Sequence, residues 1–168
     1  MDLNGLIWTK NVTPIDGEVW AYKNIDTIYP DLKIFALHWR NLKGRDENNA
    51  RYPLEAELMI LRQHGKVTHI VQMLNNQLYR DTNAEDEFNI YRIVQVVWMT
   101  DNWEHPPEND KVFDCSIHFP RFGKAIKLEN IQKLQTRWGK EGLAFQQHVQ
   151  SVLNNSLTKS PTFKSAGL

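Results

Sequence analysis

The chain has 168 residues, 41% of them hydrophobic and 11% aromatic, which is the length and composition of one domain with a sizeable core. Its 20 basic and 20 acidic residues cancel, which excludes the overall positive charge of a protein that coats nucleic acid. Cys115 is the only cysteine, so no intramolecular disulfide forms and a reducing, cytoplasmic location is favoured. Residues 1–10 are too polar for a signal peptide, and no apolar run reaches the roughly 18 residues of a membrane span. We therefore expect a soluble cytoplasmic protein with no membrane contact.

The first part of the chain predicts short strands. Residues 6–9 and 18–23 contain bulky strand-favouring side chains and flank a turn at residues 13–17. Residues 34–39 predict a third strand. Residues 41–50 contain one glycine and three asparagines, a composition that predicts a polar loop of a length at which loops are often functional.

A β-hairpin is the clearest feature of the sequence. Residues 57–73 contain two apolar, β-branched runs on either side of residues 64–66 (His-Gly-Lys). We expect a three-residue loop, with Gly65 supplying the positive φ that such a loop requires. The hairpin predicts that the centre of the protein is a sheet.

A long strand and a shorter one are predicted after the hairpin. Residues 88–100 alternate apolar and polar side chains at first and are apolar on both faces from Ile93 onward, which predicts a central strand of a barrel or a covered sheet. Two prolines at 106–107 then interrupt the chain, and residues 112–118 predict a further strand.

The pattern changes after Gly123 to the periodicity of helices. Apolar residues recur at spacings of three and four over residues 128–138, and Gly139 follows in the position of a C-terminal cap. The same pattern predicts a second helix over residues 145–154. We expect both helices to pack on one end of the sheet. The predicted fold class is α+β, with one domain over residues 1–154 and a flexible tail over residues 155–168.

The spacing of the histidine, cysteine and acidic residues excludes most catalytic or metal-binding motifs. None of the six histidines forms an i, i+4 pair and there is no second cysteine, so neither a metal nor a cofactor is predicted. Cys115 follows Asp114, whose charge raises the thiol pKa and disfavours a nucleophile. Asp31 and Lys33 have the Asp-x-Lys spacing of a metal-dependent nuclease, with Glu57 as a further carboxylate, and this enzyme remains one alternative.

The aromatic residues suggest a binding function. Six tryptophans exceed what a core of this size requires, and an indole ring can stack on a base for roughly 1 to 3 kcal/mol. Trp39 is the strongest candidate, because phosphate or base donors surround it in the sequence: Arg40, Asn41, Lys43, Arg45 and Arg51. Charge is also uneven, since residues 121–140 hold six basic residues and one acidic residue. A basic face of this kind suits either a phosphate chain or a solvated helix surface.

Residues 20–100 resemble the PUA-like barrel superfamily and, within it, the EVE domains. Those domains have a Gly-Asp pair before an apolar strand, a turn and a strand that returns along a pocket. Here Ala56-Glu57 stands in place of Gly-Asp, residues 58–62 and 67–73 match the two strands, and residues 88–100 match the following barrel strand.

The resemblance implies a small mixed or antiparallel β-barrel that is not catalytic and that accommodates a modified or flipped base in an aromatic pocket. It implies DNA or RNA as the partner. By position, the residues implied to line the pocket are Trp20, Tyr22, Trp39 and Trp98, and those implied to read polar groups are Arg40, Arg51 and His69. The second alternative to this function is a protein-interaction subunit that docks a protein partner through the helices of residues 128–153.

Overall fold

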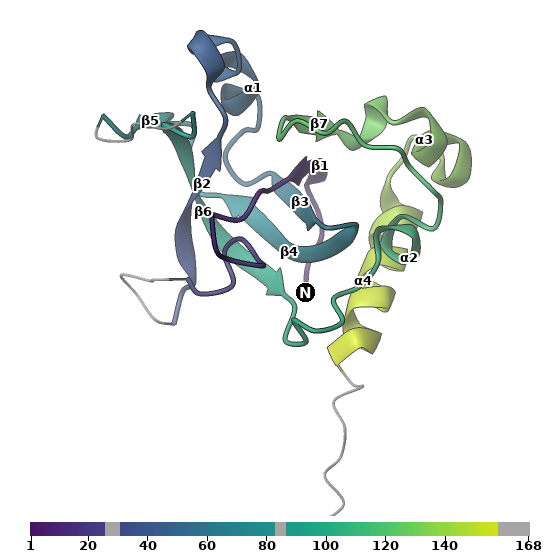
Figure 1. Cartoon of the computed structure of the whole chain (residues 1–168). Coiled ribbons are helices and arrows are strands. Elements are labelled where there is room, and N and C mark those ends of the chain that lie inside the picture. The colour runs from purple at the N-terminus through teal and green to yellow at the C-terminus, as the bar shows by residue number, and fades with distance from the viewer. Residues whose placement is uncertain (26–30, 83–86, 158–168) are drawn as a thin grey trace, which may run out of the picture.

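One mixed sheet of seven strands organises the computed structural model, which describes residues 1–25, 31–82 and 87–157 (Figure 1). The strands are β1 (Leu6–Asn11), β2 (Ile34–Trp39), β3 (Leu58–Gln63), β4 (Lys66–Met73), β5 (Tyr79–Arg80), β6 (Ile90–Met99) and β7 (Ala125–Lys127). Their order in the sheet is β2-β6-β4-β3-β1-β7, and β5 pairs with β6. The β1–β3 pair is parallel and the other described pairs are antiparallel.

The sheet curls into a half-barrel with β2 and β7 at its two ends (Figure 1). Among the described residues, no backbone pairing joins β2 to β7, so the predicted closure of the barrel is not reached. Helix α1 (Glu47–Arg51) lies near this gap, and its Ala50 packs into the concave side of the sheet.

Three further helices cover the opposite face of the sheet (Figure 1). They are α2 (Asn109–Phe113), α3 (Gln132–Trp138) and α4 (Leu143–Leu157), and 3-10 turns occur at Leu42–Gly44 and Leu128–Asn130. Two C-terminal helices are present as predicted, but the first begins at Gln132 instead of residue 128, because residues 128–130 form a 3-10 turn; Gly139 ends α3 with φ of 77°. Helix α4 continues to Leu157, beyond the predicted end at Asn154, so the predicted tail is wrong for its first residues. Residues 158–168 of that tail lie outside the described residues.

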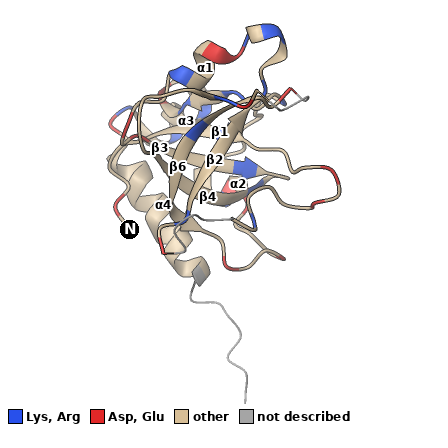
Figure 2. Ribbon diagram, turned by 90° about the vertical axis from the view of Figure 1, so that its left-hand side faces the viewer, with Lys and Arg blue, Asp and Glu red and all other residues tan. Residues whose placement is uncertain are grey.

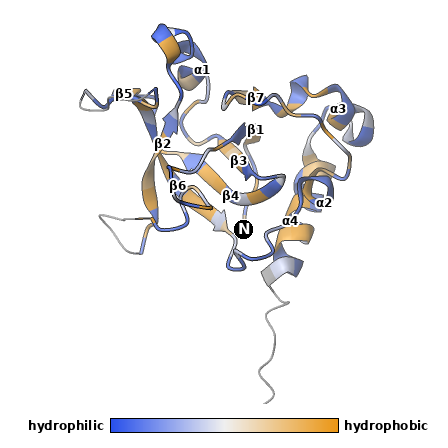
Figure 3. Ribbon diagram, in the orientation of Figure 1, coloured by the Kyte–Doolittle hydropathy of each residue, from blue (hydrophilic) through white to orange (hydrophobic). Residues whose placement is uncertain are grey.

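Two hydrophobic clusters form the core, one on each face of the sheet. The concave cluster includes Leu37, Trp39, Met59, Leu61 and Val71, all of which are fully buried. The cluster beneath the helices joins Ile60 and Ile70 of the sheet to Phe113, Phe145 and Leu153. Apolar residues accordingly follow the central strands and α4 in Figure 3.

The central strands agree with the sequence-based predictions, whereas the hairpin turn is tighter than expected. Strands β1, β2, β3, β4 and β6 all fall on predicted strand segments. The β3–β4 turn contains only His64 and Gly65, with φ of 52° and 72°. Two consecutive residues with positive φ are characteristic of the two-residue type I′ turn, which matches the twist of the flanking strands.

The predicted strand at residues 18–23 is wrong, because this segment forms turns and bends. The side-chain amide of Gln63 binds both backbone groups of Ala21, with N···O distances of 2.8 Å and 3.1 Å. Tyr22 has a φ of 58°, which is incompatible with an extended strand. A side chain of β3 thus replaces the backbone partner that a strand would have needed.

Two further predictions are wrong where short helices replace the expected structure. Residues 41–50 contain a 3-10 turn and most of α1 instead of a loop. Residues 112–118 contain no described strand, because Val112 and Phe113 are the buried end of α2, and Phe113 stacks on Phe145 with ring centroids 5.9 Å apart. Helices of five residues are too short to show a helical period in the sequence.

Candidate functional site

Trp39 and Trp98 point to opposite faces of the sheet. Trp39 is 0% exposed in the concave cluster, and its Nε1 donates to Asn49 Oδ1 at 3.0 Å. Trp98 is 6% exposed and belongs to the cluster under the helices. A β-bulge at Val97 explains the separation, because Ile70 pairs with Trp98 while the next residue of β4 pairs with Val96. The extra residue reverses the alternation of side chains along β6.

Two other predicted residues, Tyr22 and Trp20, lie in one aromatic cluster with His69. Its ring centroid lies 6.5 Å from that of Tyr22 and 5.6 Å from that of Trp103, which in turn lies 5.9 Å from Trp20. His69 Nε2 donates to the carbonyl of Tyr22 at 3.1 Å, and Thr68 Oγ1 donates to Nδ1 at 3.0 Å. Burial lowers the pKa of His69 to about 4, so the ring is neutral and ties the segment around Tyr22 to the sheet.

The two predicted arginines lie at the surface and are ion-paired. Arg40 pairs with Glu87, and Arg51 Nη2 lies 3.1 Å from Glu47 Oε1 within α1. Arg40 borders the hollow described below, whereas Arg51 does not line it. The structure therefore does not bring the seven predicted residues together in one pocket.

The residues of the nuclease alternative are also apart. The carbonyl of Lys33 accepts a hydrogen bond from Val96 of β6, whereas Glu57 immediately precedes β3. Strands β6 and β4 thus separate Lys33 from the strand of Glu57, and three strand spacings amount to about 14 Å along the sheet. The Glu57 carboxylate accepts hydrogen bonds from Trp8 Nε1 at 2.6 Å and from the amide of Leu54 at 2.8 Å.

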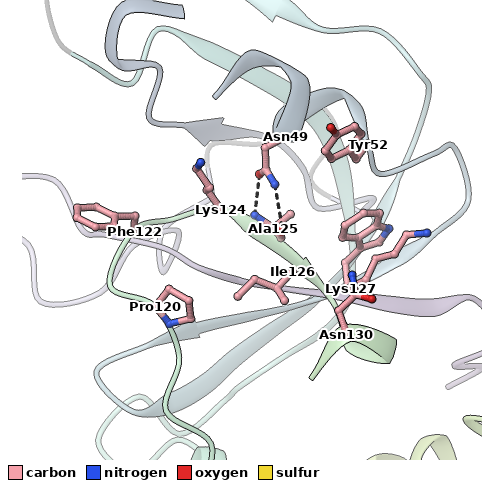
Figure 4. A pocket seen from close by; sticks show the side chains of 10 residues that line it. Asn49, Tyr52, Pro120, Phe122, Lys124, Ala125, Ile126, Lys127 and Asn130 are labelled. Carbon is pink, nitrogen blue, oxygen red and sulfur yellow. Dashed lines mark hydrogen bonds between the residues drawn. The ribbon is translucent and has the colours of Figure 1, made fainter. Parts of the chain in front are cut away.

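A solvent-open groove lies where α1 meets β7 (Figure 4). It has a volume of about 630 Å³ and we name it the Phe122 groove; it is lined by Trp8, Asn49, Tyr52, Pro120, Phe122, Lys124, Ala125, Ile126, Lys127 and Asn130. Tyr52 and Phe122 are 61% and 64% exposed. The charged side chains that line it belong to Lys124 and Lys127.

Asn49 holds the two sides of the groove together. Its Oδ1 accepts from the amide of Ala125 at 2.8 Å, and its Nδ2 donates to the carbonyl of Ala125 at 2.8 Å (Figure 4). The same Oδ1 accepts from Trp39 Nε1. One side-chain amide therefore links α1, the end of β2 and the outer edge of β7, which positions Tyr52 opposite the segment of Phe122.

A smaller hollow adjoins the groove and shares Phe122 and Lys124 with it. We name this space of about 270 Å³ the Arg45 hollow; it is lined by Trp39, Arg40, Leu42, Arg45, Asp46, Phe122, Gly123 and Lys124. Lys124 Nζ lies 3.1 Å from Asp46 Oδ1, and the guanidinium of Arg40 lies 5.9 Å from the centre of the Phe122 ring. Basic and acidic residues accordingly alternate around α1 in Figure 2.

Lys10 lies directly behind the Arg45 hollow. Its Nζ donates to the carbonyls of Gly123 at 2.5 Å and of Asn11 at 3.2 Å, and lies 4.9 Å from the centre of the Trp39 ring. The Lys10 pKa is lowered to about 7, mainly by burial and in addition by the charge of Arg62, while the charge of Asp46 opposes both effects. This ammonium group therefore holds its proton less tightly than an exposed lysine does.

Sequence reasoning identified Trp39 and Arg40 at the edge of this region but missed Tyr52, Phe122 and Lys124 as groove residues. The basic composition of residues 121–140 was the signal that pointed here. This signal was ambiguous, because residues 121–140 also contain α3, and the residues of this segment that line the groove all lie between Phe122 and Asn130, before α3 begins.

Comparison of the chain with protein-family models, with curated proteins and with solved structures found no match. In the described ranges, no three His, Cys, Asp or Glu side chains are grouped so as to hold a metal ion. None of the helices described here has the length and apolar character that crossing a bilayer requires. The Phe122 groove is thus interpreted from its own geometry.

Proposed function

We propose that this chain is a non-catalytic module that binds nucleic acid, and that the Phe122 groove holds an unstacked base of a single strand. The observation that carries the proposal is the pair of exposed rings, Tyr52 and Phe122, at a groove whose charged lining residues are two lysines. Exposed aromatic rings combined with cations are the usual means of binding single strands, and each stacked base contributes about 1 to 3 kcal/mol. The volume of about 630 Å³ lies in the range of small-ligand pockets.

The lysines are available to phosphate groups although both have acidic neighbours. Lys124 pairs with Asp46 at 3.1 Å and Lys127 with Glu129 at 3.5 Å, and both lysine side chains are about half exposed. Exposed ion pairs contribute little, so a phosphate competes with them readily.

The proposal keeps the base-binding function implied by the PUA-like resemblance but places the base at a different site. The curled sheet and its helical cover support the likeness, but the concave interior is filled by Trp39, Leu37 and Leu61. The base therefore binds at the open end of the half-barrel, between α1 and β7, and Tyr52 and Phe122 take the place of the predicted indole rings.

The apolar residues that predicted the two C-terminal helices are largely buried, which favours nucleic-acid binding over the protein-interaction alternative. Leu134 of α3 and Phe145, Val149 and Leu153 of α4 are buried against the protein's own sheet. No observation on these helices therefore favours a partner chain over nucleic acid.

Substitution of the groove aromatics tests the proposal. We expect Phe122→Ala and Tyr52→Ala each to weaken binding of a fluorescent single strand of about 16 nucleotides by roughly tenfold, because each removes a stacking ring. Fluorescence anisotropy with DNA and RNA strands measures the effect. Lys124→Ala should in addition reduce the slope of log affinity against log salt by about 0.7, the share of one phosphate contact.

Matched controls are available on α4 and beyond α3. Leu143 is 59% exposed and Lys140 is also exposed, so Leu143→Ala and Lys140→Ala remove an apolar and a cationic surface group away from the groove. Circular dichroism confirms that each variant is folded. Affinities of the groove variants equal to those of the controls would refute the proposed function.

A further inference from the structure

We propose that the Arg45 hollow binds a phosphate monoester, and that it holds the terminal phosphate of the strand whose base lies in the Phe122 groove. The second clause rests on the proposed function, whereas the first depends only on the hollow.

The charges that line the hollow match a phosphate monoester. Arg40, Arg45 and Lys124 supply three cations, and Lys10 behind the wall adds a fourth when it is protonated; Asp46 and Glu87, the partner of Arg40, supply two carboxylates, which leaves a net charge of plus two. A phosphate monoester carries about −1.5 to −2 at pH 7, whereas a phosphodiester within a chain carries one negative charge. Two arginines also offer the planar donors that bind phosphate oxygens in pairs. The terminal phosphate is thus a closer match than an internal one.

The wall of the hollow supplies an independent observation. A Cβ on Gly123 would lie 3.1 Å from Lys10 Nζ, so Gly123 allows the backbone to pack directly on the buried ammonium group. Carbonyl oxygens, not carboxylates, accept the hydrogen bonds of Lys10, and Arg62 adds a like charge nearby. A buried cation without an anionic partner is costly.

An anion in the hollow would compensate this buried charge. Trp39 and Gly123 line the hollow and also contact Lys10, which places the ammonium group just behind the bound anion. The direction of the Lys10 pKa shift agrees with this interpretation, because burial and the charge of Arg62 lower the pKa more than the charge of Asp46 raises it. Phosphate binding and Lys10 protonation should therefore reinforce each other.

The hollow is also placed to read the end of a bound strand. It shares Phe122 and Lys124 with the Phe122 groove, so a base in the groove and a phosphate in the hollow lie on the two sides of the same segment. The guanidinium of Arg40 lies 5.9 Å from the centre of the Phe122 ring and also lines the hollow, so it contributes positive charge beside the ring.

The first experiment uses inorganic phosphate as the probe. The pKa of Lys10 is measured by NMR of the lysine side chain in a buffer without phosphate and then with saturating phosphate. We expect phosphate to raise the Lys10 pKa in the wild-type chain and to have a clearly smaller effect in Arg45→Ala. A Lys10 pKa that is the same with and without phosphate would overturn the proposal.

The second experiment compares strands of one sequence that carry a 5′-phosphate, a 3′-phosphate or hydroxyl groups at both ends. We expect one of the phosphorylated strands to bind about tenfold more tightly than the hydroxyl strand, and Arg45→Ala to abolish this preference. Lys140→Ala is the control and should keep the preference.

The outcomes separate the two proposals. Equal affinities for all three strands would overturn the terminal-phosphate inference and leave the proposed function standing. Failure of every strand to bind, together with a phosphate-dependent Lys10 pKa, would refute nucleic-acid binding and support the hollow as a phosphate site for a smaller ligand.

Discussion

Lys10 and Arg92 are two cationic residues whose side chains lie inside the half-barrel, where each is bound by backbone carbonyls. The guanidinium of Arg92 donates to the carbonyls of Ala50, Pro53 and Asn75, which fixes the end of α1 and the turn after β4. Lys10 makes the corresponding contacts to Asn11 and Gly123 on the side of β7. Each cation thus satisfies carbonyl groups that the irregular ends of the sheet leave without strand partners.

The Lys10 pKa makes the stability of the protein depend on pH. The Lys10 pKa is about 7 in the folded chain and 10.5 in the unfolded chain. Between pH 7 and pH 10.5, Lys10 is therefore mostly protonated in the unfolded chain and mostly neutral in the folded chain. The contribution of Lys10 to the free energy of unfolding is therefore lowest below pH 7 and rises with pH, by at most about 1.4 kcal/mol per pH unit.

Urea unfolding of wild type and Lys10→Met in phosphate-free buffer measures this effect. We expect the free energy of unfolding of wild type, relative to that of Lys10→Met, to increase by about 2 kcal/mol from pH 7 to about pH 9. The free energy of unfolding of Lys140→Met should change with pH in the same way as that of wild type. A difference between wild type and Lys10→Met that does not change with pH would contradict the buried-ammonium interpretation.

At the scale of elements, two side-chain amides serve as partners for backbone groups. Asn49 pairs with Ala125 and fastens α1 to β7, and Gln63 pairs with Ala21 and fastens the segment before β2 to β3. Helix α1 has only five residues, so its position depends on these contacts more than on its helix propensity.

Asn49→Ala should therefore be strongly destabilising. The substitution leaves Trp39 Nε1 and both backbone groups of Ala125 without a partner, and we expect the free energy of unfolding to fall by about 3 kcal/mol. Asn48→Ala, on an exposed neighbour in the same helix, should change it by less than about 0.5 kcal/mol. Urea titrations followed by tryptophan fluorescence provide the comparison, and similar midpoints for the two variants would argue against the role of Asn49.

The elements that sequence reasoning predicted are the long ones. Strands β4 and β6 and helix α4 repeat their apolar residues over enough positions to reveal a period. Helices α1 and α2 and strand β7 have five residues or fewer and show none. The β-bulge at Val97 could not be predicted from the sequence either, because it depends on how β4 pairs with β6.

At the scale of the whole molecule, the C-terminal helices complete the core of the sheet. Phe145 is 4% exposed and packs between Phe113 and Trp138, whereas Leu143 at the start of the same helix is exposed. A helix that docked a partner would instead keep its apolar residues accessible in the free protein.

Two substitutions in α4 test this role. We expect Phe145→Ala to lower the free energy of unfolding by about 3 to 5 kcal/mol, because it leaves a cavity beneath the helices. Leu143→Ala should change it by less than about 0.5 kcal/mol. Chemical unfolding gives both values, and a mild effect of Phe145→Ala would indicate that α4 is not part of the folding unit.

The sequence alone determined the mixed α and β composition, the hairpin at its centre, the main strands and the two C-terminal helices, because each follows from local periodicity or turn chemistry. Tertiary structure decided which faces are buried. Trp39 lies in the core and Phe122 at the surface although both are aromatic residues beside basic ones, since burial depends on what the curled sheet and α1 bring over each ring. The groove and the hollow combine residues in or beside α1 with residues in or beside β7, and Asn49 and Ala125, which join the two segments, are 76 positions apart, so no local pattern encodes that contact.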